Sequence, residues 1–276
     1  MGTRNLICVW WKGKWYIAQY HQWNGFPEGT GLALYRFLAF AGNVERLKHG
    51  LDKHIYYPTE EEVDAIHAEC QAWDEARWER ARQGLEDPGE IDWNRTGYSE
   101  LYPSMWRSTG ARVFDLIIRA CRCDGSKEEG EQEEEVGGDI DDNNHHARML
   151  RTSTAYILSK AKLPEKLPIR MELEFVNATL SCEWAYVVDL DREVLEMYCG
   201  GPNARKKHDV EGHRFKDVGP PSATVPDLVC DWSFGELQLL ESDKEFMDKV
   251  KAVWKKRMAE RKKEEWVYEE HGWADY

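Results

Sequence analysis

Residues 3–31, near the start of the sequence, restrict the fold more than any other stretch. They read TRNLICVWWKGKWYIAQYHQWNGFPEGTG. Leu6 to Trp11 is an apolar run rich in residues that favour strands, and Lys12 to Lys14 is a polar turn. Trp15 to Trp23 is a second run, in which aromatic and polar residues are mixed. The pattern predicts a β-hairpin, and we expect both of its faces to be buried because neither is plainly polar.

Side chains of a strand alternate between its two faces, so the second run divides into two sets. One predicted face carries Trp15, Ile17, Gln19, His21 and Trp23, and the other carries Tyr16, Ala18, Tyr20 and Gln22.

A glycine-rich loop follows the hairpin from residue 24 to residue 31. It holds three glycines and Pro27. Glycine permits backbone conformations that other residues avoid, and proline fixes one angle, so we expect a single defined shape. An apolar helix over 32–41 follows, and its N-terminus would add backbone N–H groups to the loop. The spacing matches neither the Gly-Lys-Ser/Thr loop nor the GxGxxG loop of nucleotide-binding proteins, so we predict no nucleotide site.

Three blocks of sequence resemble a poorly characterised family of proteins from fungal, bacterial and phage genomes. The first is the TRN start at Thr3-Arg4-Asn5, the AQYxQWxG hairpin and the PxGxG loop, the second is CEWAYVVDLD from Cys182 to Asp191, and a weaker third is STGA from Ser108. The blocks cover about a quarter of the chain. The family has no settled activity, so the resemblance implies a grouping and little chemistry. The TRN start before a hairpin also looks like the opening of N-terminal nucleophile hydrolases.

Charge and cysteine content limit the classes of function. The net charge is −14, but residues 124–142 hold ten acidic residues and one lysine, so the rest of the chain has a net charge of only −5. Nucleic acid is therefore a disfavoured partner. The sequence shows no bilayer-spanning run and no signal segment, and its seven cysteines are scattered. We expect reduced thiols in a soluble cytoplasmic protein that does not bind membranes.

The remaining elements predict the α+β class. Thr59 and Glu62 form a capping box before a helix that reaches about residue 83, and Ser108 or Thr109 is expected to cap another. Residues 180–188 and 194–198 predict a central hairpin that would supply cross-strand partners for the first. We expect antiparallel sheets packed with helices in a single domain over 1–276, with an αββα sandwich as one arrangement. Residues 124–146 read as a disordered acidic insertion, and 243–266 as a charged amphipathic helix.

Three residues are candidates for catalysis of amide hydrolysis. Thr3 would act as an N-terminal nucleophile if it became the first residue, because its own α-amino group could serve as the base. The alternative is that Thr3 simply starts a strand. Cys8 is flanked by apolar residues, which favours an inert core thiol over a second nucleophile. Glu183 could act as an acid or base or could pair with Arg4, whereas turn chemistry is sufficient to explain Asp189 and Asp191.

Polar and aromatic residues of the hairpin and loop form the best candidate binding site. Side-chain amides beside aromatic rings suit a neutral polar ligand or a peptide, which they would hold by hydrogen bonds and stacking. The alternative is a buried polar network that fixes the hairpin. The predicted ligand-binding residues are Arg4, Asn5, Gln19, Tyr20, Gln22, Trp23, Asn24, Gly25 and Gly29.

No metal site or cofactor is predicted. His21, His54 and His67 are isolated in the sequence, the pair His145-His146 has no rigid element to hold it, and Cys121-Arg122-Cys123 lacks a second pair. The sequence therefore predicts a binding protein for a small polar molecule or peptide, with amide hydrolysis as its enzymatic form. The alternative is a protein-interaction module that uses the basic C-terminal helix or the acidic insertion.

Overall fold

The computed structural model describes residues 3–85, 95–122 and 163–272. The acidic insertion predicted at 124–146 lies outside the described residues. Residue contacts divide the chain into two compact units, one formed by residues 1–44 and 171–276 and the other by residues 45–170. The two are described separately below, and the prediction of a single domain stays a prediction.

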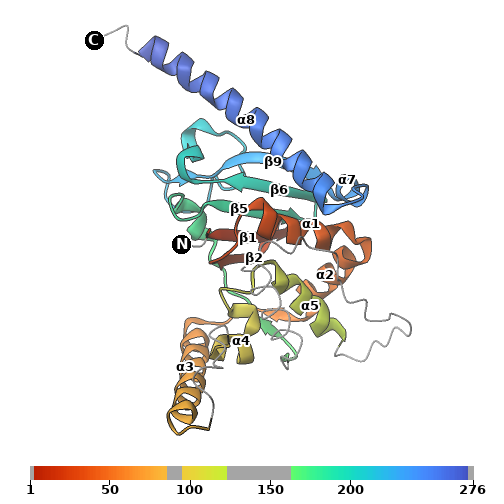
Figure 1. The fold of residues 1–276 in the computed structure, drawn as a ribbon, viewed down its shortest axis with the longest axis vertical. Coiled ribbons are helices and arrows are strands. Elements are labelled where there is room, and N and C mark those ends of the chain that lie inside the picture. The colour runs from red at the N-terminus through yellow and green to blue at the C-terminus, as the bar shows by residue number, and fades with distance from the viewer. Residues whose placement is uncertain (1–2, 86–94, 123–162, 273–276) are drawn as a thin grey trace. The chain divides into compact units, whose positions relative to one another are not determined.

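A five-stranded sheet forms the centre of the first unit (Figure 1). Its strands are β1 (Asn5–Trp11), β2 (Lys14–His21), β5 (Trp184–Asp189), β6 (Val194–Cys199) and β9 (Asp227–Ser233), in the order β2-β1-β5-β6-β9. Neighbouring strands are antiparallel except for β1 and β5, which run parallel. The α+β prediction and both hairpins are confirmed, and β5 is the expected partner of the first hairpin. The αββα arrangement is not formed, because the other described strands make only two-stranded sheets.

A β-bulge corrects the predicted faces of β2. Val9 pairs with Ile17 but Trp10 pairs with Trp15, so Tyr16 is an extra residue in the ladder. The extra residue moves Trp15 to the face that carries Ala18, where both pack in one hydrophobic cluster. Trp15 there stacks on Phe215, with 5.6 Å between the ring centroids.

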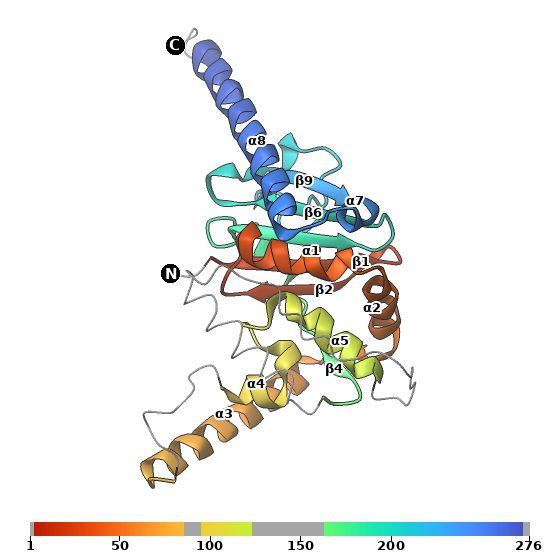
Figure 2. The same cartoon turned by 45° about the vertical axis from the view of Figure 1, so that its right-hand side comes forward.

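Helices cover one face of this sheet. They are α1 (Leu32–Ala39), α7 (Phe234–Gln238) and α8 (Asp243–Gly272), and a π-helical turn over Pro27–Gly31 leads into α1. Figures 1 and 2 show α1 and α8 lying over the same side of the strands. Stacked rings join the helices, because Tyr35 of α1 lies 4.6 Å from Phe246 of α8 between centroids. The predicted C-terminal helix is thus confirmed and is longer than expected.

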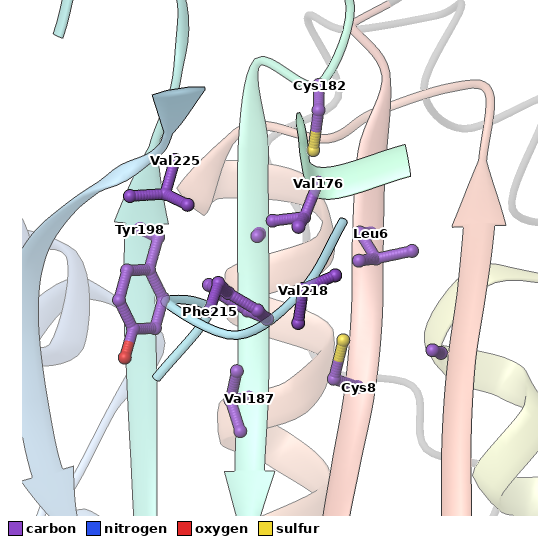
Figure 3. Packing of buried hydrophobic residues seen from close by; sticks show 11 residues of the cluster. Leu6, Cys8, Val176, Cys182, Val187, Tyr198, Phe215, Val218 and Val225 are labelled. Carbon is purple, nitrogen blue, oxygen red and sulfur yellow. The ribbon is translucent and has the colours of Figure 1, made fainter. Parts of the chain in front are cut away.

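Irregular chain covers the opposite face. Val176, Phe215 and Val218 lie over the side chains of β1, β5 and β6 there (Figure 3). The covering segment contains the 3-10 turn Leu173–Asn177 and a small sheet of β7 (Arg205–Lys206) with β8 (Thr224–Val225). Phe215 is fully buried, so this face is a true core and not a solvent-exposed side of the sheet.

Asp189 and Asp191 hold the β5–β6 turn and the β1–β2 turn by hydrogen bonds. This confirms the prediction that turn chemistry explains these two residues. Asp189 Oδ1 accepts hydrogen bonds from the backbone N–H groups of Asp191 and Arg192, at 3.0 and 2.9 Å. Asp191 accepts from the N–H groups of Lys12 and Gly13 in the β1–β2 turn, at 2.8 and 2.9 Å. The two hairpins are therefore joined at their turns as well as along their strands.

A buried ionic network lies beside this junction. Arg214 donates to Asp189 and to both carboxylate oxygens of Glu196, and Tyr198 donates to Glu196 at 2.7 Å. Asp189 and Glu196 are almost fully buried. Burial and the charge of Glu196 raise the pKa of the Tyr198 hydroxyl, which holds it in the donor form. Because the charges are paired and hydrogen-bonded, we assign the network a structural role.

The second unit is mainly helical. It contains most of α2 (Ala41–Lys53), then α3 (Glu60–Arg82), α4 (Gly97–Leu101) and α5 (Val113–Arg122), and a two-stranded sheet of β3 (Ile55–Tyr56) with β4 (Leu167–Pro168). The capping box at Thr59 and Glu62 is confirmed, with both reciprocal hydrogen bonds formed. Thr109 lies at the N-cap of a 3-10 turn, Gly110–Arg112, that runs into α5. Its side chain forms no cap, because the Thr109 hydroxyl donates to the Pro103 carbonyl at 2.6 Å.

A pH-dependent contribution to stability is expected from His213. Its Nδ1 accepts from the Phe215 N–H at 3.2 Å and its Nε2 lies 2.9 Å from the Pro226 carbonyl, which fits the neutral ring. Burial lowers its pKa below the ordinary value of 6.5. The contribution is therefore complete above about pH 6.5 and is lost as the pH falls below that value, because the unfolded state binds the proton first. We expect the wild-type protein to lose more unfolding free energy than His213→Gln between pH 7.5 and pH 5.5, measured by urea denaturation; equal losses would contradict this.

Candidate functional site

The loop over residues 22–31 joins β2 to α1, and hydrogen bonds hold its backbone against the sheet. The Gly25 N–H donates to the Thr3 carbonyl at 3.0 Å, and the Gly25 carbonyl accepts from the Tyr186 hydroxyl at 2.7 Å. Tyr186 belongs to β5 and is fully buried. The middle of the loop is thus fixed from both sides, by the start of β1 and by a side chain of the central strand.

The second half of the loop is closed by its own hydrogen bonds. The Asn24 carbonyl accepts from the N–H and the hydroxyl of Thr30, at 2.9 and 3.0 Å, and the Gly29 N–H donates to Phe26. A side chain at Gly29 would place its Cβ 2.3 Å from the Asn24 carbonyl oxygen, so the closure needs glycine there. This confirms the expectation of one defined loop shape for the described residues.

Five side chains of this loop are exposed. They are Gln22, Trp23, Asn24, Phe26 and Glu28. Trp23 is 40% exposed and Phe26 is 51% exposed, whereas the glycine and proline between and after them are buried. A fixed backbone thus presents two aromatic rings and two side-chain amides to solvent, with the carboxylate of Glu28 beyond them. We name the uncharged set, Gln22 to Asn24 with Phe26, the tip platform.

The other polar residues of the predicted site lie beneath the loop. Asn5 is fully buried and its Nδ2 lies 3.2 Å from Nδ1 of His21, its partner in the β1–β2 ladder. The Asn5 Oδ1 atom accepts no hydrogen bond from the residues that the structure describes. Gln19 is only 2% exposed, on the same face of the sheet. These residues match the buried polar network that was the alternative to a ligand site.

Arg4 and Tyr20 are held by distant parts of the first unit. The backbone of Arg4 exchanges two hydrogen bonds with Glu183: its N–H donates to Glu183 Oε1 at 3.3 Å and its carbonyl accepts from the Glu183 N–H at 3.0 Å. The predicted contact between Arg4 and Glu183 is therefore present, made by the Arg4 backbone. The Tyr20 N–H donates to Glu172 at 2.9 Å, and its ring meets Phe175 edge-on.

The two candidate nucleophiles lie in the interior. Cys8 is fully buried in the hydrophobic cluster of Figure 3, and burial raises the pKa of its thiol well above the ordinary value. This agrees with the inert-thiol reading of the sequence. Thr3 is 6% exposed and lies beside Gly25 through its carbonyl. Thr3, Asn5, His21 and Gly25 are thus brought together, whereas Cys8 and Glu183 are not part of that group.

The predicted partner surface on the C-terminal helix is partly paired within the chain. Arg257 donates to Asp227 at 3.1 Å, and Lys249 pairs with Glu245 at 3.4 Å. Of the described helices, none combines the length and the apolar character that crossing a bilayer requires. A role of this helix in binding a protein stays a prediction.

Comparisons with known proteins give no relative. No family model, no curated protein and no solved structure matches the chain. The resemblance drawn from the TRN, AQYxQWxG and CEWAYVVDLD blocks stays a prediction, and the site is argued from its geometry alone.

Two residues of the site were missed by sequence reasoning. Phe26 is exposed between the buried Gly25 and Pro27, and an apolar residue in a loop gives no sequence signal of exposure. Tyr186 anchors Gly25 from a strand 161 residues away, and no local pattern indicates that pairing.

Substitution of Gly25 tests the anchoring of the loop. A Cβ at this position would lie 2.8 Å from Asn5 Nδ2 and 2.9 Å from the Thr3 carbonyl oxygen. We expect Gly25→Ala to lower the free energy of unfolding by about 1–3 kcal/mol, because overpacking forces these buried neighbours apart. The control is Gly235→Ala, where no atom lies within 4 Å of the added carbon. Urea denaturation measures both, and an unchanged Gly25→Ala variant would show that the loop is not held as described.

Proposed function

We propose that this protein binds a neutral ligand that carries amide groups, a small polar molecule or a short peptide, at the tip platform. The observation that supports it is the pair of exposed aromatic side chains, Trp23 and Phe26, on a loop whose backbone is fixed to the sheet. Exposed aromatic rings in contact with polar groups are common at binding surfaces.

The side chains of the platform indicate the chemistry of the ligand. Gln22 and Asn24 each carry an amide, which supplies both donors and an acceptor and no charge. Peptide groups have the same donors and acceptors, so they match these amides directly. The rings of Trp23 and Phe26 would pack against the flat or apolar parts of the same ligand.

The fixed backbone favours binding energetically. Ordering a flexible loop on binding opposes affinity by about 0.5–1.5 kcal/mol for each immobilised side chain, and more for the backbone. Here the hydrogen bonds of Gly25, Gly29 and Thr30 order the loop before any ligand is present. Folding itself therefore orders the loop, and less free energy is lost to ordering when the ligand binds.

Amide hydrolysis at the same place is the enzymatic form of this proposal. Amide hydrolysis would need Thr3 to become the first residue, so that a free α-amino group stands beside its hydroxyl. Thr3 lies next to Asn5 and His21 under the platform, which would place it near a bound peptide. The hydrolytic activity and the cytoplasmic location stay predictions.

Replacement of Trp23 tests the binding proposal. The probe is a panel of neutral tetrapeptides, acetylated and amidated at their ends, followed by ligand-observed NMR. We expect binders in this panel and an affinity at least about 10-fold lower for Trp23→Ala, because truncation of a central aromatic contact removes a large share of the binding energy. The free energy of unfolding should change by about 1 kcal/mol or less, since the ring is 40% exposed.

The matched control is Trp78→Ala. Trp78 is also 40% exposed but belongs to α3 in the other unit. Peptide binding should be unchanged in this variant. The proposal fails if no peptide binds, or if both variants weaken binding equally.

A further inference from the structure

Three side chains of metal-ligand type come together in the second unit. They are His49, His54 and Cys121, and one ligand atom of each lies within 4.8 Å of the others. His49 is exposed, whereas His54 and Cys121 are 5% and 9% exposed. The group therefore reaches from the surface of the unit into its interior.

Close packing of α2 on α5 brings the cysteine to the histidines. Gly50 lies between the helices, and a Cβ there would fall 2.3 Å from Ile117 Cγ2 and 3.1 Å from Cys121 Sγ. Only glycine allows the helices to approach this closely. The approach places the last turn of α5, which holds Cys121, beside the end of α2, which holds His49.

His54 is held rigidly where α2 ends and β3 begins. Its N–H donates to the Gly50 carbonyl at 2.8 Å, and its carbonyl accepts from the Leu167 N–H at 2.7 Å. Nδ1 of the ring lies 3.3 Å from the Glu165 carbonyl oxygen. Donation from Nδ1 to a backbone carbonyl fixes the tautomer that leaves Nε2 as the coordinating atom, an arrangement that commonly supports metal-bound histidine.

From this geometry we propose that His49, His54 and Cys121 bind a zinc ion. Two imidazoles and one thiolate are a donor set that zinc favours, and they exclude magnesium and calcium, which take oxygen ligands. Three protein ligands leave a fourth position for water or another donor, and the exposed His49 gives the ion a route from solvent.

The three ligand atoms need to move only slightly closer together to bind zinc. Tetrahedral zinc, with bonds of about 2.0–2.3 Å, separates its ligand atoms by about 3.3–3.8 Å. These atoms lie within 4.8 Å, so a shift of about 1 Å or rotation of the exposed His49 ring forms the site. The Cys121 thiol, 3.3 Å from the Ile117 carbonyl, would lose its proton to solvent as zinc binds, so binding should weaken at lower pH.

The position of His54 beside His49 and Cys121 differs from one sequence expectation. We predicted His54 to be isolated and the Cys121-Arg122-Cys123 pattern to be too weak for a metal site. Separation along the chain concealed the group, because His54 and Cys121 are 67 positions apart and the second histidine of the group, His49, was not considered.

Cobalt titration tests the proposal with the full untagged chain. Co²⁺ replaces Zn²⁺ in such sites, and a cysteine thiolate bound to it gives a charge-transfer band in the near ultraviolet. We expect one equivalent of Co²⁺ to produce this band and one equivalent of Zn²⁺ to remove it. Cys121→Ser should abolish the band, and His49→Asn should weaken Zn²⁺ binding by about 100-fold or more.

Matched variants separate the site from general effects. His67→Asn replaces another exposed histidine of the same unit, and Cys230→Ser replaces a cysteine of similar burial, 8% exposed, in the other unit. Both should bind Co²⁺ like the wild type. His49 is exposed, so His49→Asn is expected to fold, which circular dichroism checks. No band in the wild type, a band retained in Cys121→Ser, or equal weakening in His49→Asn and His67→Asn would each overturn the proposal.

Discussion

The parallel pairing of β1 with β5 is the interaction on which the first unit depends. It joins Asn5–Trp10 to Trp184–Asp189 in continuous register. Both ends of the pairing are reinforced, because the Arg4 backbone bonds Glu183 at one end and Asp191 bonds the backbone of Lys12 and Gly13 at the other. These contacts connect residues 178 or 179 positions apart. Parallel strands need a long crossover, and here the entire second unit lies within it.

The proposed binding site follows from this pairing. β1 supplies the Thr3 carbonyl just before its first residue and Asn5 at its start, and β5 supplies the Tyr186 hydroxyl. The Thr3 carbonyl and the Tyr186 hydroxyl both bond to the backbone of Gly25. The loop therefore has a fixed shape only when β1 and β5 are adjacent. Trp23 and Phe26 can remain exposed because the residues between them carry the structural contacts. The structural contacts and the proposed binding contacts are thus made by neighbouring residues of one loop.

Local patterns in the sequence were sufficient for some elements. Alternation predicted both hairpins, the spacing of Thr59 and Glu62 predicted a helix start, and the amphipathic pattern over 243–266 predicted the C-terminal helix. Each of these signals lies within a few residues. The amide and aromatic composition of the loop predicted a binding site, and this stays a prediction. Of the predicted set, only Gln22, Trp23 and Asn24 are exposed.

Long-range contacts could not be predicted in this way. Nothing local indicates that β5 pairs with β1 in parallel, that a bulge at Tyr16 turns Trp15 to the other face, or that β9 follows Pro226. The group of His49, His54 and Cys121 depends on two helices that approach at Gly50, which is visible only in three dimensions.

Native-state hydrogen exchange of the loop amides tests the central claim most directly. The account holds that loop 22–31 is a rigid part of the sheet, so the amides of Gly25 and Thr30 should exchange only when β1 and β5 separate. We predict that their free energies of exchange equal those of the β1 and β5 amides. Exchange of Gly25 and Thr30 at a much lower free energy, while the strand amides remain protected, would show that the loop opens by itself and would contradict the account.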